Sequence, residues 1–333
     1  MIGESAASLP TPRRFVAVFG HALATSRALQ LVLALAVETV WFATVSPYFV
    51  STSNFMTILQ NSADLAIVAV GMAVVLTLGG VDVSVGSVEG IAAILIGKAI
   101  QAHWGGFAAA LGPITGATLG LANGLIVVYG RVPAIITTLG TMNIWRAAIF
   151  ILIGGRWISG LPDVLGGLIS GSLAGIPVLS MILIAVYALT WYVMRLSALG
   201  PHIHAIGNNP VAAAYAGVPV RRDSLFAYTL VGAATGLAAA LYVARYQNIE
   251  INVGTSLALD AIAGAVLGGT SVMGGELNLL GTAVGVLFVA VLRNGLVLMD
   301  LPSLWEQVVV GVLLIAVLSV DFVRQRIRKL PHP

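Results

Sequence analysis

The 333-residue sequence contains no cysteine and only two lysines, Lys98 and Lys329. The absence of cysteine excludes disulfide bonds and thiol chemistry. A phosphate-binding loop of the G-x-x-x-x-G-K-[ST] type requires a lysine in that motif, and neither lysine stands in one. The sequence also has no nucleophile elbow, and no histidines and carboxylates with the spacing of metal ligands. We therefore expect no catalytic residues, no metal and no cofactor, and the chain is not predicted to be an enzyme.

Charged residues are also scarce. They make up 9% of the chain, whereas 59% of the residues are hydrophobic; soluble proteins carry roughly 25% charged and 45–50% apolar residues. A soluble protein of this composition would have too little polar surface, but a protein surrounded by lipid would not. The formal net charge is +3, but the basic residues stand mainly at the ends of apolar stretches instead of forming a patch, as the positive-inside rule predicts. We therefore expect a bilayer protein and no nucleic-acid partner.

The apolar stretches predict an all-α fold, a polytopic bundle of about ten transmembrane helices. A spanning helix needs about 20 mainly apolar residues. The third and eighth stretches adjoin glycine-rich breaks, so either could be partly re-entrant. The predicted spans are residues 28–49, 56–79, 84–101, 107–129, 133–154, 174–195, 225–247, 257–272, 279–299 and 303–321.

The basic residues predict the orientation of these spans. The three most basic soluble pieces are the N-terminus, residues 195–224 and the C-terminal tail. Six spans separate the first two pieces and four separate the last two, so all three pieces lie on the same, cytoplasmic side. Lys98, Arg156 and Arg245 fall on the other side, so the bias is strong but incomplete. We predict an inner-membrane protein with both termini in the cytoplasm. Its parts are a cytoplasmic N-terminal segment (1–27), a membrane domain (28–321) with a large cytoplasmic loop at about 196–224, and a cytoplasmic tail (322–333).

Two glycine-rich strings follow apolar runs, one in each half of the chain. They are GGVDVSVGS at 79–87 and LGGTSVMGG at 267–275. Paired glycine-interrupted segments indicate the central site of many transporters, although strings this short also match by chance. Asp82 and Ser84 place a carboxylate and a hydroxyl at the first break, which predicts a polar wall of a solute pathway. The alternative is a structural loop in which Asp82 caps the next helix.

The segment 204–222 predicts a short helix of about two turns between two spans. Asn209 is suited to cap this helix, Pro210 to occupy its first position and Gly217 to end it. Such a helix would bury little of its surface against its own subunit. Its small alanine side chains give a smooth knob for a groove on another protein, although an ordinary amphipathic connector would have the same spacing.

Four ordered motifs within residues 56–320 resemble those of ATP-binding-cassette permeases. The segment 204–222 is similar to the conserved cytoplasmic loop of these permeases, the coupling helix that docks on the ATPase. The strings at 78–87, 132–141 and 259–271 resemble signatures of the monosaccharide-importer permeases, of the ribose, galactose, arabinose and xylose type, which are related to branched-chain amino-acid permeases.

The resemblance has departures. Val211-Ala212-Ala213 stands where the coupling segment often has a glutamate in an E-A-A core, so the docking charge is expected elsewhere, on Arg221 or Arg222. Residues 276–278 are Glu-Leu-Asn, where the family commonly has a more basic or Gly-Ser-rich string. Residues 154–162 are similar to a stretch of autoinducer-2 and rhamnose permeases, which favours a deoxysugar or a sugar-like signal as cargo or, alternatively, reflects the binding protein that docks there.

The resemblance implies a permease subunit that moves a monosaccharide or sugar-like signal across the inner membrane. Its expected partners are an ABC ATPase subunit, which hydrolyses the ATP, a periplasmic sugar-binding protein, and a second permease subunit in a homodimer or a paralogous heterodimer. The candidate substrate-pathway residues are Asp82, Ser84, Asn123, Asn143, Trp145, Thr270 and Ser271. The candidate ATPase-coupling residues are Gly207, Asn208, Asn209, Pro210, Ala212, Ala213, Gly217, Arg221 and Arg222.

An ion-coupled secondary transporter of a small neutral solute is the alternative function. It requires titratable groups within the spans, and Asp64, Asp82, Asp260 and Arg293 are candidates. A buried arginine normally needs a partner, and for Arg293 either Asp260 or Glu306 would serve in a structural pair. Trp145 has its own alternative, because a lone tryptophan near the end of a span is more often an interface anchor.

Overall fold

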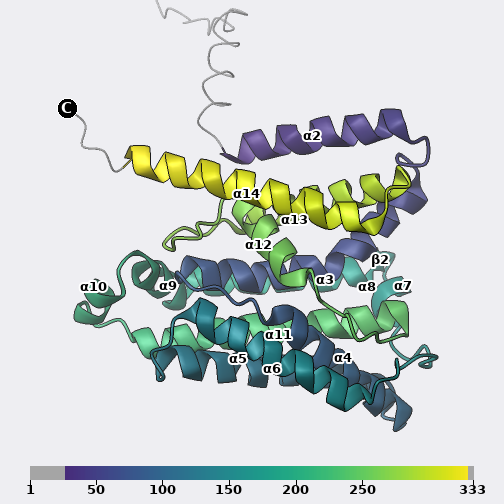
Figure 1. Ribbon diagram of the computed structural model, residues 1–333, viewed down its shortest axis with the longest axis horizontal. Helices are drawn as coiled ribbons and strands as arrows, with labels where there is room; N and C mark the ends of the chain where they lie inside the picture. Colours follow the sequence, from purple (N-terminus) through teal and green to yellow (C-terminus); the bar gives the residue numbers. More distant parts are fainter. Residues whose placement is uncertain (1–26, 329–333) are drawn as a thin grey trace, which may run out of the picture.

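The computed structural model describes residues 27–328, which form a bundle of helices running roughly parallel or antiparallel to one another (Figure 1). The predicted N-terminal segment before residue 27 and the last five residues of the predicted tail lie outside this part of the chain. The elements are α2 (Arg27–Val45), α3 (Thr52–Thr77), α4 (Val85–Gln101), the 3₁₀ helix η1 (Gly105–Ala110), α5 (Leu111–Val128), α6 (Ala134–Ile153), α7 (Gly167–Ser170), β1 (Ser172–Leu173), β2 (Ile176–Pro177), α8 (Val178–Leu196), α9 (Leu199–Asn208), α10 (Pro210–Tyr215), α11 (Val220–Tyr246), α12 (Leu257–Leu267), α13 (Leu279–Leu298) and α14 (Ser303–Arg328).

The predicted all-α membrane bundle is confirmed. Helices α2, α3, α4, η1 with α5, α6, α8, α11, α12, α13 and α14 follow the ten predicted spans in order. Seven of them within residues 27–328 are long and apolar enough to cross a membrane. The third and eighth predicted spans are the short helices α4, with 17 residues, and α12, with 11. Both adjoin the glycine-rich breaks, as the sequence indicates.

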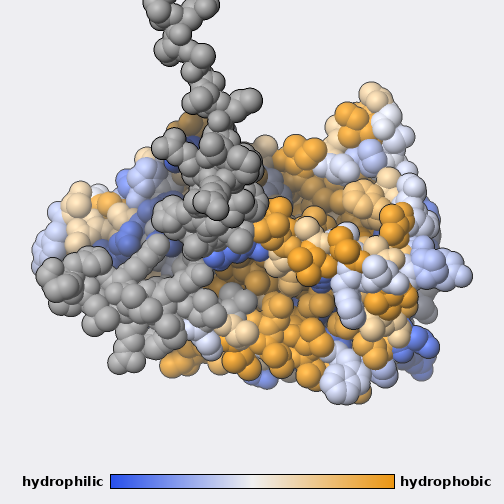
Figure 2. All heavy atoms as spheres, turned by 90° about the horizontal axis from the view of Figure 1, so that it is seen from above, coloured by the Kyte–Doolittle hydropathy of each residue, from blue (hydrophilic) through white to orange (hydrophobic). Residues whose placement is uncertain are grey.

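The core of the bundle lies along α3 and α4. Every residue from 67 to 77 in the second half of α3 is buried, and so is most of α4. Peripheral helices such as α2 and α8 instead keep many large apolar side chains exposed, Trp41 and Trp191 among them. Apolar side chains cover much of the face seen in Figure 2, as expected for a surface in contact with lipid.

Close backbone packing joins α5 to α11. The glycines of α5 at 112 and 116 face those of α11, and a Cβ atom at Gly116 would overlap the carbonyl oxygen of Gly232. In the same way a Cβ atom at Gly112 would overlap the carbonyl oxygen of Gly236. Glycines four residues apart on facing helices let the two backbones approach closely, which is a common way to join helices in a membrane.

The two glycine-rich strings end their helices in the same way. After α3, the N–H of Gly79 donates to Leu76 and the N–H of the next residue donates to Val75. After α12, the N–H of Gly269 donates to Val266 and the next N–H to Ala265. This is the Schellman arrangement, which requires a left-handed residue; φ is +85° at Gly79 and +93° at Gly269. The two halves therefore share a local helix-ending motif.

The connection between α6 and α8 carries the stretch 154–162, α7 and the small antiparallel β1–β2 sheet. Ile158 and Ile249 exchange backbone hydrogen bonds of 3.2 and 2.8 Å. This bridge joins the α6–α8 connection to residues 247–256, between α11 and α12. Helix α11 has 27 residues, so it carries the chain over roughly 40 Å from α10 at one end of the bundle to this bridge near the other (Figure 1).

Candidate functional site

A polar cavity of about 990 Å³ lies between α3, α4, α11, α12, α13 and the start of α14. Its lining also includes much of the connection 247–256, which the backbone bridge at Ile249 holds in place. Two backbone carbonyls of this connection, at Ile251 and Val253, accept hydrogen bonds from the guanidinium of Arg146 on α6, at 3.2 and 3.0 Å. The cavity is therefore bounded by membrane helices and by a loop that is fixed in position.

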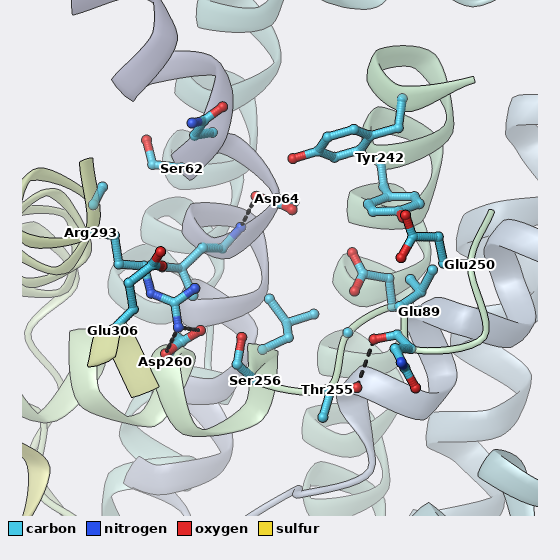
Figure 3. Close-up of a pocket in the computed structure, with 18 of the residues that line it drawn as sticks. Ser62, Asp64, Glu89, Tyr242, Glu250, Thr255, Ser256, Asp260, Arg293 and Glu306 are labelled. Carbon is cyan, nitrogen blue, oxygen red and sulfur yellow. Dashed lines mark hydrogen bonds and ion pairs between the residues drawn. The ribbon is translucent and has the colours of Figure 1, made fainter. Parts of the chain in front are cut away.

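The side chains of the cavity form two opposing walls (Figure 3). One wall carries Arg293, Asp260 and Glu306. The other carries Tyr242, Glu89 and Glu250, and Asp64 of α3 projects into the space between them. Of residues 27–328, five carboxylates and one arginine line the cavity. Carboxylates thus predominate among the charged groups of the lining.

Arg293 and Asp260 form an ion pair across α13 and α12, with Nη2 2.7 Å from both carboxylate oxygens. This pairing was one of the two predicted for Arg293, and the structure selects Asp260 over Glu306. The Asp260 side chain is 5% exposed and that of Arg293 28% exposed. The pair therefore neutralises a charge buried in the wall of the cavity.

Arg293→Met is expected to lower the free energy of unfolding by about 3 kcal/mol, because it leaves Asp260 buried without its partner. The double variant Asp260→Asn/Arg293→Met is expected to recover part of that loss. Arg222→Met is the matched control: Arg222 is 72% exposed, and its partner Asp223 keeps a second contact at 2.7 Å, to His202. The control should cost less than about 1 kcal/mol. Thermal unfolding in detergent measures all three variants, and equal losses for the single and double variants would contradict the pairing.

Three of the predicted pathway residues come together in a buried network outside the lining of this cavity. Asp82 accepts hydrogen bonds from the Ser84 hydroxyl at 2.6 Å and the Ser84 N–H at 2.9 Å. The Asn123 amide of α5 donates to the Ser84 hydroxyl at 2.7 Å and to Asp82 at 3.3 Å. All three side chains are at most 1% exposed. In this structure the network fixes the break between α3 and α4 against α5.

The other predicted pathway residues lie in two separate places, on α6 and in the second glycine-rich break. Asn143 is exposed on α6 and donates to the carbonyl of Leu139 at 2.8 Å. Trp145 is partly buried against the core around α4. Thr270 and Ser271 are buried in the second break, where the Thr270 hydroxyl lies 3.3 Å from that of Thr282. They too lie outside the lining of the 990 Å³ cavity.

The short helix predicted in the large loop is confirmed as α10. The Asn209 side chain accepts from the N–H groups of Val211 and Ala212, both at 3.0 Å, and Pro210 is the first residue. Gly217, with φ +84°, follows the end of the helix. Ala213 points into the subunit and is 4% exposed, whereas Val211 and Tyr215 are 63% and 89% exposed. The exposed face of α10 is therefore built on these two larger side chains, which the sequence analysis did not select.

Helix α9 joins α10 to both glycine-rich breaks, an arrangement that the sequence did not indicate. At its end, Gly207 packs so tightly that a Cβ atom would overlap the carbonyl oxygen of Thr77, the last residue of α3. Gly274, beyond α12, packs against the same glycine, and the N–H of Gly275 donates to Thr77 at 2.8 Å. We call Thr77, Gly207, Gly274 and Gly275 the junction. Asn208 also reaches it, because its side chain lies against Gly275.

Arg221 and Arg222 lie at the start of α11, beside α10. The Arg221 guanidinium stacks over the ring of Tyr129, 5.7 Å from its centroid. Arg222 contacts Asp223, which also binds His202 of α9. Because the Asp223 side chain is fully buried, this cluster fixes the start of α11 to α9.

The cavity residues Glu89, Glu250 and Tyr242 were missed by the sequence analysis. Glu89 had a usable signal: it is an ionisable residue within an apolar stretch, and such residues mark functional sites in membranes. Glu250 and Tyr242 had none, because only the fold places them there, Tyr242 through the packing of α11 on α4 and Glu250 through the connection after α11.

Comparison with known proteins finds similarity over most of the chain. The family model described as branched-chain amino acid transport system / permease component matches residues 54–318. The chain is 34% identical over 300 residues to the autoinducer 2 import system permease protein LsrC of Klebsiella pneumoniae subsp. pneumoniae, covering 90% of this chain and 87% of that protein. It is 35% identical over 301 residues to the ribose import permease protein RbsC of Escherichia coli (strain K12), covering 88% and 93%. No solved structure shows significant similarity to the chain.

Proposed function

Because the chain belongs to the family of branched-chain amino acid transport system permease components, we propose that it is the membrane-spanning subunit of an ATP-driven importer of a monosaccharide or sugar-like solute. The observation that carries this proposal is the similarity, over most of both chains, to import permeases for ribose and autoinducer 2. Two features of the structure support it: a polar cavity within the bundle and the short helix α10, exposed at one end.

The proposal includes the partners of the chain. An ATPase subunit would bind α10, since this chain has no P-loop of its own. A sugar-binding protein would deliver the solute at the other end of the bundle, near the cavity and the α6–α8 connection. A second permease subunit, identical or paralogous, would complete the assembly in the inner membrane, with both termini in the cytoplasm.

In this proposal the junction carries the motion of the ATPase to the cavity. Helix α10 moves with the ATPase, and α9 follows because only Asn209 separates the two helices. His202 links α9 to α11, and Gly207 of α9 packs against the other residues of the junction. The junction includes Thr77 at the end of α3, the helix that carries Asp64. It also includes Gly274 and Gly275 in the loop after α12, the helix that carries Asp260. Such a set of packed contacts transmits a displacement because protein interiors deform little.

ATP hydrolysis by the assembled importer tests the proposed function. We expect the ATPase, when bound to this chain in lipid nanodiscs, to hydrolyse ATP faster on addition of the binding protein loaded with its sugar. The binding protein without sugar should stimulate less. An ATPase that neither binds this chain nor responds to the loaded binding protein would contradict the proposal.

Tyr215→Ser is expected to weaken ATPase binding at least tenfold, about 1.4 kcal/mol or more, since exposed tyrosines are frequent hot spots of interfaces. Tyr48→Ser is the matched control. Tyr48, just after α2, is 73% exposed, compared with 89% for Tyr215, but it is not on the docking helix. The dissociation constant of the purified permease and ATPase measures the effect, and an unchanged constant for Tyr215→Ser would exclude α10 as the main contact.

A further inference from the structure

The cavity contains a buried carboxylate with one oxygen that no donor of the described residues reaches. Glu89 of α4 is 2% exposed and lines the cavity. One of its carboxylate oxygens, Oε1, has no hydrogen-bond partner among the described residues. Figure 3 shows this side chain directed into the cavity, on the wall opposite Arg293. A buried acceptor without a donor costs free energy, so this position favours a ligand that supplies one.

The backbone beside Glu89 leaves space for its carboxylate. Gly254 has a φ of +71°, and a Cβ atom there would lie 2.7 Å from Oε2 of Glu89. A side chain at residue 254 would therefore press on the carboxylate, and the left-handed backbone would strain it. A second orphan acceptor, the Oδ1 atom of Asn248 in the same lining, is also buried without a partner among residues 27–328.

The other residues of the cavity lining also favour a ligand with many hydroxyl groups. Its acceptors include Asp64 and Glu250 as well as Glu89 and Asn248. Among the described residues Arg293 is the single basic residue of the lining, and Asp260 already holds it at 2.7 Å. Tyr242 and Tyr246, with ring centroids 4.7 Å apart, add an aromatic surface. A polyol offers hydroxyl donors to the acceptors and C–H groups to the rings, and a volume of about 990 Å³ is ample for a small solute.

We propose that this cavity is a solute-binding chamber within the permease, and that Glu89 accepts hydrogen bonds there from the hydroxyl groups of a neutral polyol. Asp64 and Asn248 complete the acceptor set. The inference rests on the proposed function for the identity of the cargo, but it adds a binding site that lies apart from both glycine-rich breaks.

Uptake of labelled D-ribose into vesicles that contain the full importer tests the role of Glu89. Glu89→Gln is expected to reduce uptake at least tenfold, while the loaded binding protein still stimulates ATP hydrolysis. Asp300→Asn is the matched control. Asp300 is an exposed carboxylate outside the cavity with φ +57°, a conformation that asparagine also adopts, so its uptake should stay within twofold of the unsubstituted protein. Unchanged uptake by Glu89→Gln would overturn the proposal.

A second measurement does not depend on transport. Because the chain has no cysteine, Thr255→Cys places a single thiol in the cavity lining, and Ser172→Cys places one on the exposed β1 strand. Saturating D-ribose should slow maleimide labelling at least threefold at residue 255 and not at residue 172. The protection should disappear when Glu89→Gln is added.

Protection of residue 255 by choline but not by D-ribose would overturn the polyol assignment in favour of a cation site, and equal labelling rates with and without D-ribose would overturn the chamber itself. Failure of the proposed function looks different: the unsubstituted importer would then take up no labelled sugar with ATP, whatever residue 89 is.

Discussion

Gly207→Ala is expected to reduce solute uptake by the assembled importer at least tenfold while ATP hydrolysis continues. The added Cβ atom would overlap the carbonyl oxygen of Thr77, and the N–H of Gly275 lies close behind it. Both obstacles are backbone, so no side chain can turn away, and α9 must shift. Overpacking of this kind costs about 1–3 kcal/mol, which changes the balance between two conformations of the bundle by about fivefold to more than a hundredfold.

Gly140→Ala is the matched control for the junction. Gly140 lies within α6, and apart from the backbone of its own helix no atom of the described residues stands within 4 Å of the position of its Cβ. Uptake and ATP hydrolysis are measured with the same vesicles for both variants. Gly207→Ala should lose uptake and keep both its amount in the membrane and its ATPase binding. Normal uptake by Gly207→Ala would contradict the transmission of motion through the junction.

Gly116→Ala combined with Gly232→Ala is expected to destabilise the bundle by about 3 kcal/mol or more. These glycines face each other between α5 and α11, and a Cβ atom on either would overlap the carbonyl oxygen of the other. The helices would have to separate along the most extensive contact of the fold, with overpacking costs at both positions. The midpoint of thermal unfolding in detergent should fall by about 6 °C or more.

Gly140→Ala combined with Gly311→Ala provides the control for this effect. Both glycines lie inside helices, and within residues 27–328 no atom beyond the backbone of their own helices stands within 4 Å of either Cβ position. Alanine favours helices over glycine, so the control should match or exceed the stability of the unsubstituted protein. Equal stability of the two double variants would show that the close approach of α5 and α11 does not support the fold.

The helical architecture could be predicted because its signals are local. Each span is an apolar run of suitable length. Asn209 and Pro210 indicate where α10 begins, and Gly217 indicates where it ends. Helix α9 was missed, because residues 199–208 contain a proline and two histidines and have no apolar run. Its place is set by tertiary contacts instead, at His202 and Gly207.

The candidate site was less predictable because the chain assembles it from distant elements. Asp64, Glu89, Glu250 and Asp260 come from four separate segments, and no spacing in the sequence relates them. The sequence analysis instead selected the polar residues of the first glycine-rich break, because they stand next to one another in the sequence. The structure places Asp82 of that break in a network of hydrogen bonds with its neighbours. The role of that network in the solute pathway stays a prediction.

Uptake of labelled sugar into sealed vesicles is the most direct test of the account. The vesicles contain this chain, its ATPase and its binding protein, and uptake is compared with ATP on the ATPase side and with an imposed proton or sodium gradient alone. We predict uptake with ATP only, and none when the ATPase is omitted. Uptake driven by an ion gradient without the ATPase would contradict the account and favour an ion-coupled transporter that uses the carboxylates of the cavity.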